Sequence, residues 1–111
     1  MTQEPKMTGT VEGTGAAINV KCGFKPRYVK LFNVDDAGSK MPILEWHDQL
    51  GAGYGIKWLI GTTYTTPSII TSLGITLYCG SDADGDGQGF TIGADTDVNV
   101  SAETILWIAL R

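Results

Sequence analysis

Hydrophobic and polar residues alternate over short stretches along most of the chain, which is the period of strands rather than helices. These stretches are rich in β-branched and aromatic residues and are bounded by Gly, Asp, Asn or Pro. No window sustains the i, i+3, i+4, i+7 apolar spacing of a helix. The pattern predicts strands at Thr8–Gly13, Ala17–Lys21, Tyr28–Val34, Ile43–Trp46, Lys57–Gly61, Ile75–Cys79, Gly89–Ile92 and Thr104–Leu110, with a weaker one around Ser68–Thr71.

Short strands at regular spacing indicate an all-β protein. We expect a single-domain β-sandwich or jelly-roll-like fold of eight or nine short antiparallel strands, with a small barrel as a related alternative. A chain of 111 residues is long enough for one compact domain and too short for two. The polar residues 1–7, which include Pro5, are predicted to form a flexible N-terminal arm, and residues 8–111 the β domain.

The last predicted strand, Thr104–Leu110, is apolar on both faces. One face would carry Ile105 and Trp107, and the other Leu106, Ile108 and Leu110. Such a strand is buried on both sides or covered by a neighbouring subunit. We therefore expect this strand to contribute to a homotrimer contact, with Trp107 as its anchor, because buried Trp residues dominate interface energetics.

The composition, 42% hydrophobic and 18% charged, is that of an ordered domain. A net charge of −4 argues against nucleic-acid binding, which needs clustered Lys and Arg. The charge is unevenly spread, with basic Lys21, Lys25, Arg27 and Lys30 early in the chain and acidic Asp82, Asp84, Asp86, Asp95, Asp97 and Glu103 late. These are either two solvated loop regions or complementary edges of neighbouring subunits.

Cys22 and Cys79 are the only cysteines, too few for a zinc site or a disulfide framework. They could pair only if their Cα atoms lay close together, which sequence does not show. The N-terminus lacks the apolar segment of a signal peptide, and no run has the length of a membrane-spanning helix. We expect folding in a reducing host cytoplasm with both thiols free, and no association with a membrane.

The stretch SDADGDGQGF, residues 81–90, has the strongest resemblance to a metal site. Its Asp82, Asp84, Asp86 and Gly87 fit the first half of an EF-hand loop. Gly93 occupies the position of the bidentate glutamate, and the flanking segments are predicted strands where an EF-hand has helices. We predict a polar hairpin connector with no specific metal.

The remaining candidates for catalysis are weak. The GAGYG segment, with Gly51, Gly53 and Gly55, lacks the spacing of a dinucleotide or phosphate loop. The single histidine, His47, has no nucleophile-elbow serine to serve. Glu45 and Glu103 could form an acid/base pair only if the fold brought them together. We predict no catalytic residues, no cofactor and no enzymatic activity.

Aromatic residues have two possible roles. They could form a sugar-stacking platform, or pack in the core and at subunit contacts, which the position of every Trp within a predicted strand favours. The residues concerned are Trp46, Trp58, Trp107, Tyr28, Tyr54, Tyr64 and Tyr78.

Both ends of the chain resemble a group of small virion proteins of tailed bacteriophages. The resemblance lies in the Gly-Phe-x-Pro-x-Tyr-Val segment Gly23–Val29, the Gly-Phe-Thr-Ile-Gly segment Gly89–Gly93, and the closing segment Glu103–Ala109. It covers about half of the chain and includes no catalytic signature, and residues 35–88 have no counterpart in it.

The resemblance implies a structural role in the virion. A capsid decoration (cement) protein, a homotrimer that binds the major capsid protein and bridges capsomers at the capsid surface, is the first expectation. A tail-fibre or receptor-binding module is the alternative from the same setting. A carbohydrate-binding domain is the alternative from another class.

Overall fold

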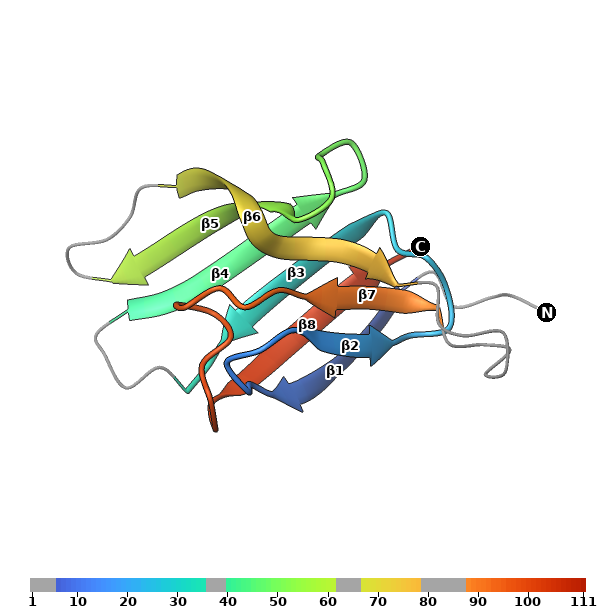
Figure 1. Cartoon of the computed structure of the whole chain (residues 1–111). Coiled ribbons are helices and arrows are strands. Elements are labelled where there is room, and N and C mark those ends of the chain that lie inside the picture. The colour runs from blue at the N-terminus through green and yellow to red at the C-terminus, as the bar shows by residue number, and fades with distance from the viewer. Residues whose placement is uncertain (1–5, 36–39, 62–66, 79–87) are drawn as a thin grey trace.

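The computed structural model describes residues 6–35, 40–61, 67–78 and 88–111 (Figure 1). No helix occurs in these ranges. The all-β prediction is confirmed, with eight strands: β1 (Lys6–Glu12), β2 (Ile18–Lys21), β3 (Tyr28–Asn33), β4 (Lys40–His47), β5 (Tyr54–Gly61), β6 (Pro67–Tyr78), β7 (Gly89–Ile92) and β8 (Thr104–Leu110).

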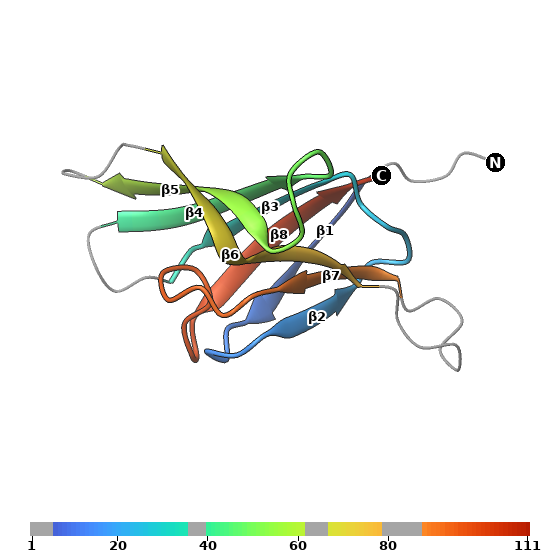
Figure 2. The ribbon, with the colours of Figure 1, turned by 45° about the horizontal axis from the view of Figure 1, so that its top comes forward.

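All eight strands belong to one antiparallel sheet with the order β1-β8-β3-β4-β5-β6-β7-β2. The sheet curls into a half-barrel, so that β7 and β2 lie over the face formed by β8 and β3 (Figures 1 and 2). Strand β8 is inserted between β1 and β3, which makes the last strand an interior member of the sheet.

The sheet turns over at a bend within β6. Residues Pro67 to Ile70 pair with β5, whereas Ile75 to Tyr78 pair with β7, and the register shifts between them. At the bend Leu73 has a φ of 64°, and a Cβ on Gly74 would lie 2.1 Å from the Tyr54 carbonyl oxygen. The two strands predicted separately from the sequence are therefore one strand with an irregular bend, where residues 71–74 have no partner between Gly55 and Tyr54 of β5.

The core fills the inside of the curl. Strands β7 and β8 are not neighbours in the sheet, yet the Phe90 and Trp107 rings meet edge to face with centroids 5.5 Å apart. Gly9 makes room for this arrangement, since a Cβ there would approach the Trp107 ring to 2.8 Å. The other buried members of the cluster are Val20, Cys22, Phe24, Val29, Leu31, Leu44, Trp46, Ile75, Ile92, Val98, Ile105 and Ala109.

One buried side chain joins the two loops at the end of the curl. Asn99, which is 2% exposed, accepts hydrogen bonds from the N–H groups of Thr14 and Gly15 at 3.0 and 3.2 Å. Its Nδ2 donates to the carbonyls of Ala16 and Gly93 at 2.7 and 3.0 Å. All of its hydrogen-bonding capacity is used, as burial of an amide requires.

The first strand begins earlier than the sequence indicates. Lys6 pairs with Leu110 and Met7 with Ala109, so these two residues of the predicted arm belong to β1. Residues 1–5 lie outside the described residues.

Candidate functional site

The face of the sheet that points away from the core, here called the outer face, carries a continuous line of large apolar residues. Cross-strand register places five residues side by side, from β8, β3, β4, β5 and β6 in turn: Leu106, Phe32, Ile43, Trp58 and Pro67. Of these, Ile43 is buried by its neighbours and the others are partly or fully exposed. We call this line the apolar row.

A second line runs parallel to the apolar row, two residues along each strand. It contains Ile108, Lys30, Glu45, Ile56 and Ile69. Opposite charges thus lie directly across from each other at its centre, with apolar residues on both sides. The Lys30 ammonium also lies 5.1 Å from the Phe32 ring centroid, within the range of a cation–π contact.

The Glu45 carboxylate is held by aromatic donors. The Tyr28 hydroxyl donates to Oε2, and the Trp58 indole donates to Oε1 at 2.9 Å. Burial raises the pKa of Tyr28 well above its usual value, and the hydrogen bond to Glu45 and the charge of that carboxylate raise it further. The arrangement fixes the Tyr28 and Trp58 rings in place on the outer face.

A shallow apolar pocket of about 330 Å³ lies on the outer face between β5 and β6. Its lining consists of Ile56, Trp58, Pro67, Ser68 and Ile69. Ile69 is 65% exposed, and Ile60 and Met41 nearby are also exposed. Soluble monomers rarely expose contiguous apolar patches larger than a few hundred Å², and larger ones mark contact sites.

The outer face is therefore the candidate functional site: a largely apolar surface with Lys30 and Glu45 across from each other at its centre. Its composition resembles the core of a protein–protein interface, which is apolar and rich in aromatic residues.

The structure corrects the predicted role of Trp107. This side chain is 6% exposed and packs inside the curl, so it does not anchor a subunit contact. Because residues alternate along β8, the outer face receives Leu106, Ile108 and Leu110 instead. The expectation that Thr104–Leu110 presents apolar residues on both sides of the sheet is confirmed, the choice of Trp107 as the anchor was wrong, and the subunit contact itself stays a prediction.

The aromatic residues do not form one platform. Trp46 is buried in the core, where its indole donates to the Gly51 carbonyl at 3.3 Å. Trp58 and Tyr28 lie together on the outer face, where both donate to Glu45. Tyr54 and Tyr78 occupy the start of β5 and the end of β6, and Tyr64 lies outside the described residues.

The two glutamates considered as an acid/base pair are not brought together. Glu45 lies on the outer face, whereas Glu103 accepts a hydrogen bond at 2.8 Å from the inward-facing amide of Asn33. His47 lies at the exposed end of β4, with Nδ1 3.0 Å from a carboxylate oxygen of Asp48.

Two of the late acidic residues, predicted to lie either in solvated loops or at a subunit edge, are instead paired with a lysine of the same chain. The Lys57 ammonium lies 3.0 Å from Asp95 Oδ2 and 2.7 Å from Asp97 Oδ2. Burial lowers the pKa of Lys57, but hydrogen bonds and charge attraction from both carboxylates outweigh it, and the net shift is upward. Asp95 Oδ1 also accepts the N–H groups of Asp97 and Val98, which fixes the loop after β7.

This inner ion cluster was missed from the sequence, although a signal exists. Ile56 and Trp58 share the outer face, so Lys57 between them must point inward, where a charge needs partners. The early basic residues also separate: Lys25 and Arg27 lie in the β2–β3 connection, and Lys30 lies on the outer face.

The GAGYG segment supports the bend of β6. Gly53 has a φ of 81°, its N–H donates to the Ile75 carbonyl at 2.8 Å, and its carbonyl accepts from the Gly74 N–H. Gly55 lies within β5, where a Cβ would meet a Leu44 methyl at 2.6 Å. These glycines fit close backbone packing.

Cys22 is a free thiol, as predicted, and donates to the Phe24 carbonyl at 3.3 Å. Burial raises the pKa of this thiol, an effect that hydrogen bonding to the backbone partly offsets. The predictions for Cys79 and for the Asp82, Asp84, Asp86 and Gly87 loop fall outside the described residues.

Within the ranges that the structure describes, no three His, Cys, Asp or Glu side chains are grouped so that they could hold a metal ion. The same ranges contain no helix able to cross a membrane. Comparisons with protein families, with characterised proteins and with solved structures found no match for this chain.

Proposed function

We propose that this chain is a structural subunit of a tailed-phage virion, a capsid decoration protein that acts as a homotrimer. The observation that carries the proposal is the apolar row, which crosses five strands and leaves Trp58, Phe32 and Leu106 accessible. A second protein surface would bury these side chains and gain about 25 cal/mol per Å² of apolar area removed from water.

The Lys30–Glu45 pair gives the proposed contact a defined register. Because Tyr28 and Trp58 already donate to Glu45, a copy or partner that covers the outer face must above all accommodate the Lys30 ammonium, since a desolvated charge is costly. Binding of many such subunits to the folded shell stabilises it by mass action, which is the role of a decoration protein.

We also propose that the curled sheet forms a jelly-roll-like sandwich of two layers. In this description the second half of β6, with β7 and β2, forms one layer, and β1, β8, β3, β4 and β5 form the other. The bend at Leu73 and Gly74 and the Phe90–Trp107 contact across the interior support it.

A receptor- or carbohydrate-binding role is the second candidate. The accessible Trp58 beside the apolar pocket favours it, since sugar rings stack on exposed aromatic faces. Such a role would use the same surface in a tail-fibre module.

Cryo-electron microscopy of the particle that carries this protein tests the proposal. Density at the junctions between capsomers, with the outer face buried, is the expected result. Density at the tail tip would replace the decoration role with the fibre role, and a glycan array positive at micromolar affinity would favour carbohydrate binding.

A further inference from the structure

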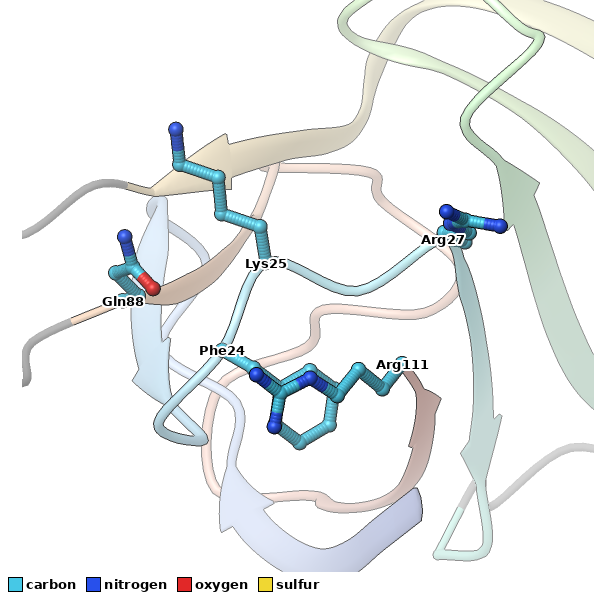
Figure 3. Close-up of a pocket in the computed structure, with 5 residues that line it drawn as sticks. All are labelled: Phe24, Lys25, Arg27, Gln88 and Arg111. Carbon is cyan, nitrogen blue, oxygen red and sulfur yellow. The ribbon is translucent and has the colours of Figure 1, made fainter. Parts of the chain in front are cut away.

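A second surface, away from the apolar row, gathers positive charge. An open pocket of about 540 Å³ lies where β8 ends and β3 begins, and is lined by Phe24, Lys25, Arg27, Gln88 and Arg111 (Figure 3). Its size falls in the range of about 300–1,000 Å³ typical of small-ligand pockets. The lining comes from three separate parts of the chain, which only the fold brings together.

Backbone hydrogen bonds hold these parts in fixed positions. The N–H of Arg27 donates to the Leu110 carbonyl at 2.8 Å, which ties the β2–β3 connection to the end of β8. The N–H groups of Cys22 and Gly23 both donate to the Gln88 carbonyl, at 3.0 and 2.9 Å. A pocket whose walls are already ordered loses less conformational entropy when it binds.

The described residues bring side-chain charges of one sign to this pocket. Lys25, Arg27 and Arg111 are exposed cations, and none of the described lining residues is acidic. Asp48 is close, since its N–H donates to the Arg27 carbonyl at 2.8 Å, but its carboxylate contacts His47. Clustered cations of this kind attract an anionic partner and speed its association.

The floor of the pocket is apolar. Phe24 is 7% exposed, and the Arg111 guanidinium lies over its ring at 5.8 Å from the centroid. In Figure 3 Lys25 and Gln88 stand on one side of this stack and Arg27 on the other. Stacking leaves the N–H edge of a guanidinium available for a planar acceptor.

The polar groups favour a peptide carboxylate over other anions. Guanidinium groups form paired hydrogen bonds with carboxylate or phosphate. The Gln88 amide offers both a donor and an acceptor, which match the C=O and N–H of a peptide group, whereas phosphate only accepts. A net charge of −4 over the whole chain disfavours a long polyanion such as nucleic acid.

We propose that this pocket binds a short acidic segment of a protein partner. Arg27, Arg111 and Lys25 bind two carboxylates of this segment, and the Gln88 amide forms hydrogen bonds with one of its peptide groups. The site is independent of the proposed decoration role, because it lies at the end of the sheet and does not use the apolar row.

The test is a titration of the ¹⁵N-labelled protein with a capped Gly-Asp-Glu-Asp-Glu-Gly peptide, monitored by NMR. We expect saturable shifts at Phe24–Arg27, Gln88 and Arg111 that weaken as salt is raised. Lys25→Gln combined with Arg27→Gln should weaken binding by about tenfold or more, since a charged hydrogen bond contributes about 1.5–3 kcal/mol and 1.4 kcal/mol is a factor of ten. Lys40→Gln, which removes the same charge as Lys25→Gln but at the start of β4, should change affinity less than about twofold.

Three controls identify the ligand class. The matched Asn/Gln peptide should not bind, and inorganic phosphate should bind more weakly than the acidic peptide. No binding at millimolar peptide, equal loss in the Lys40→Gln variant, or tighter binding of a single-stranded oligonucleotide than of the peptide would each overturn the proposal. The folded state of every variant is checked in the same spectra, so a misfolded variant is replaced by Arg111→Gln.

Discussion

Strands β3 and β8 have large apolar residues on both faces, yet the two faces differ in what surrounds them. On the inner face Val29, Leu31 and Ile105 are fully buried by the chain's own curl, and Trp107 almost so. On the outer face Phe32, Leu106 and Ile108 keep partial exposure, with the described chain folded away from them. The alternation of side chains along a strand therefore defines two faces of the sheet. The bend of the sheet determines which of these faces is buried within the domain.

The largest difference in unfolding free energy is expected between variants of two adjacent residues of β8. Trp107→Ala removes a core side chain and should cost about 3–5 kcal/mol of unfolding free energy. Leu106→Ala removes a partly exposed one and should cost the monomer about 1 kcal/mol or less. Urea denaturation at low protein concentration measures both; equal losses would mean that the faces are not distinct.

The next largest difference is expected between a lysine variant on the inner face and one on the outer face. Lys57→Met removes the shared partner of Asp95 and Asp97 in this part-buried cluster and should cost about 1.5–3 kcal/mol, the usual contribution of a hydrogen bond to a charged group. Lys30→Met on the outer face should change stability by about 0.5 kcal/mol or less. Thermal or urea unfolding measures the loss of unfolding free energy in each variant. Similar losses in both would contradict the greater burial of the inner cluster.

Alkaline pH should lower the unfolding free energy through one group on each face, Lys57 on the inner face and Tyr28 on the outer face. The folded-state pKa values of Lys57 and Tyr28 are raised, so the protonated forms stabilise the fold. This contribution is fully present below the unfolded values, about 10.4 for Lys and about 10 for Tyr, and is lost as pH rises through the folded values. Unfolding free energies measured from pH 8 to above pH 10 should fall, and Tyr28→Phe and Lys57→Met should each reduce the slope. An unchanged slope in both variants would exclude these groups.

The smallest change in stability is expected from a substitution in a turn, which belongs to neither face of the sheet. Ala102 has a φ of 68° in the turn before β8, where its N–H donates to the Gly13 carbonyl at 2.9 Å. Ala102→Gly should stabilise the protein by about 0.5–1 kcal/mol, because the left-handed conformation costs an L-residue about 1–2 kcal/mol and glycine's greater unfolded-state freedom offsets part of this. A melting temperature below that of the wild type would contradict the turn geometry.

Some elements could be predicted closely from the sequence. Gly89–Ile92 and Thr104–Leu110 are strands with the predicted bounds, because polar or glycine-containing segments flank compact apolar stretches. Strand β4 starts at Lys40, earlier than predicted, because Pro42 is accommodated within it. The continuity of β6 was not predictable, since Leu73 and Gly74 look like a turn and only the pairing of the flanking residues with β5 and β7 makes one bent strand.

The candidate sites were predictable only in part. Two-sided apolar residues in the closing strand indicated an unpaired face, but alternation alone does not say whether Trp107 or Leu106 points outward. The basic pocket was beyond prediction, because Phe24 and Arg111 come from opposite ends of the sequence and meet only through the β3–β8 pairing. The bend of the sheet, a long-range packing event, determines both.

The mass of the protein in solution, measured by light scattering at high micromolar concentration, tests the central claim that a second protein surface covers the outer face. We expect three times the 11.8 kDa of the chain for the wild type, and a folded monomer for Leu106→Gln, which places an amide in the apolar row. A wild type that remains at 11.8 kDa, or a Leu106→Gln variant that keeps the full trimer mass, would contradict it.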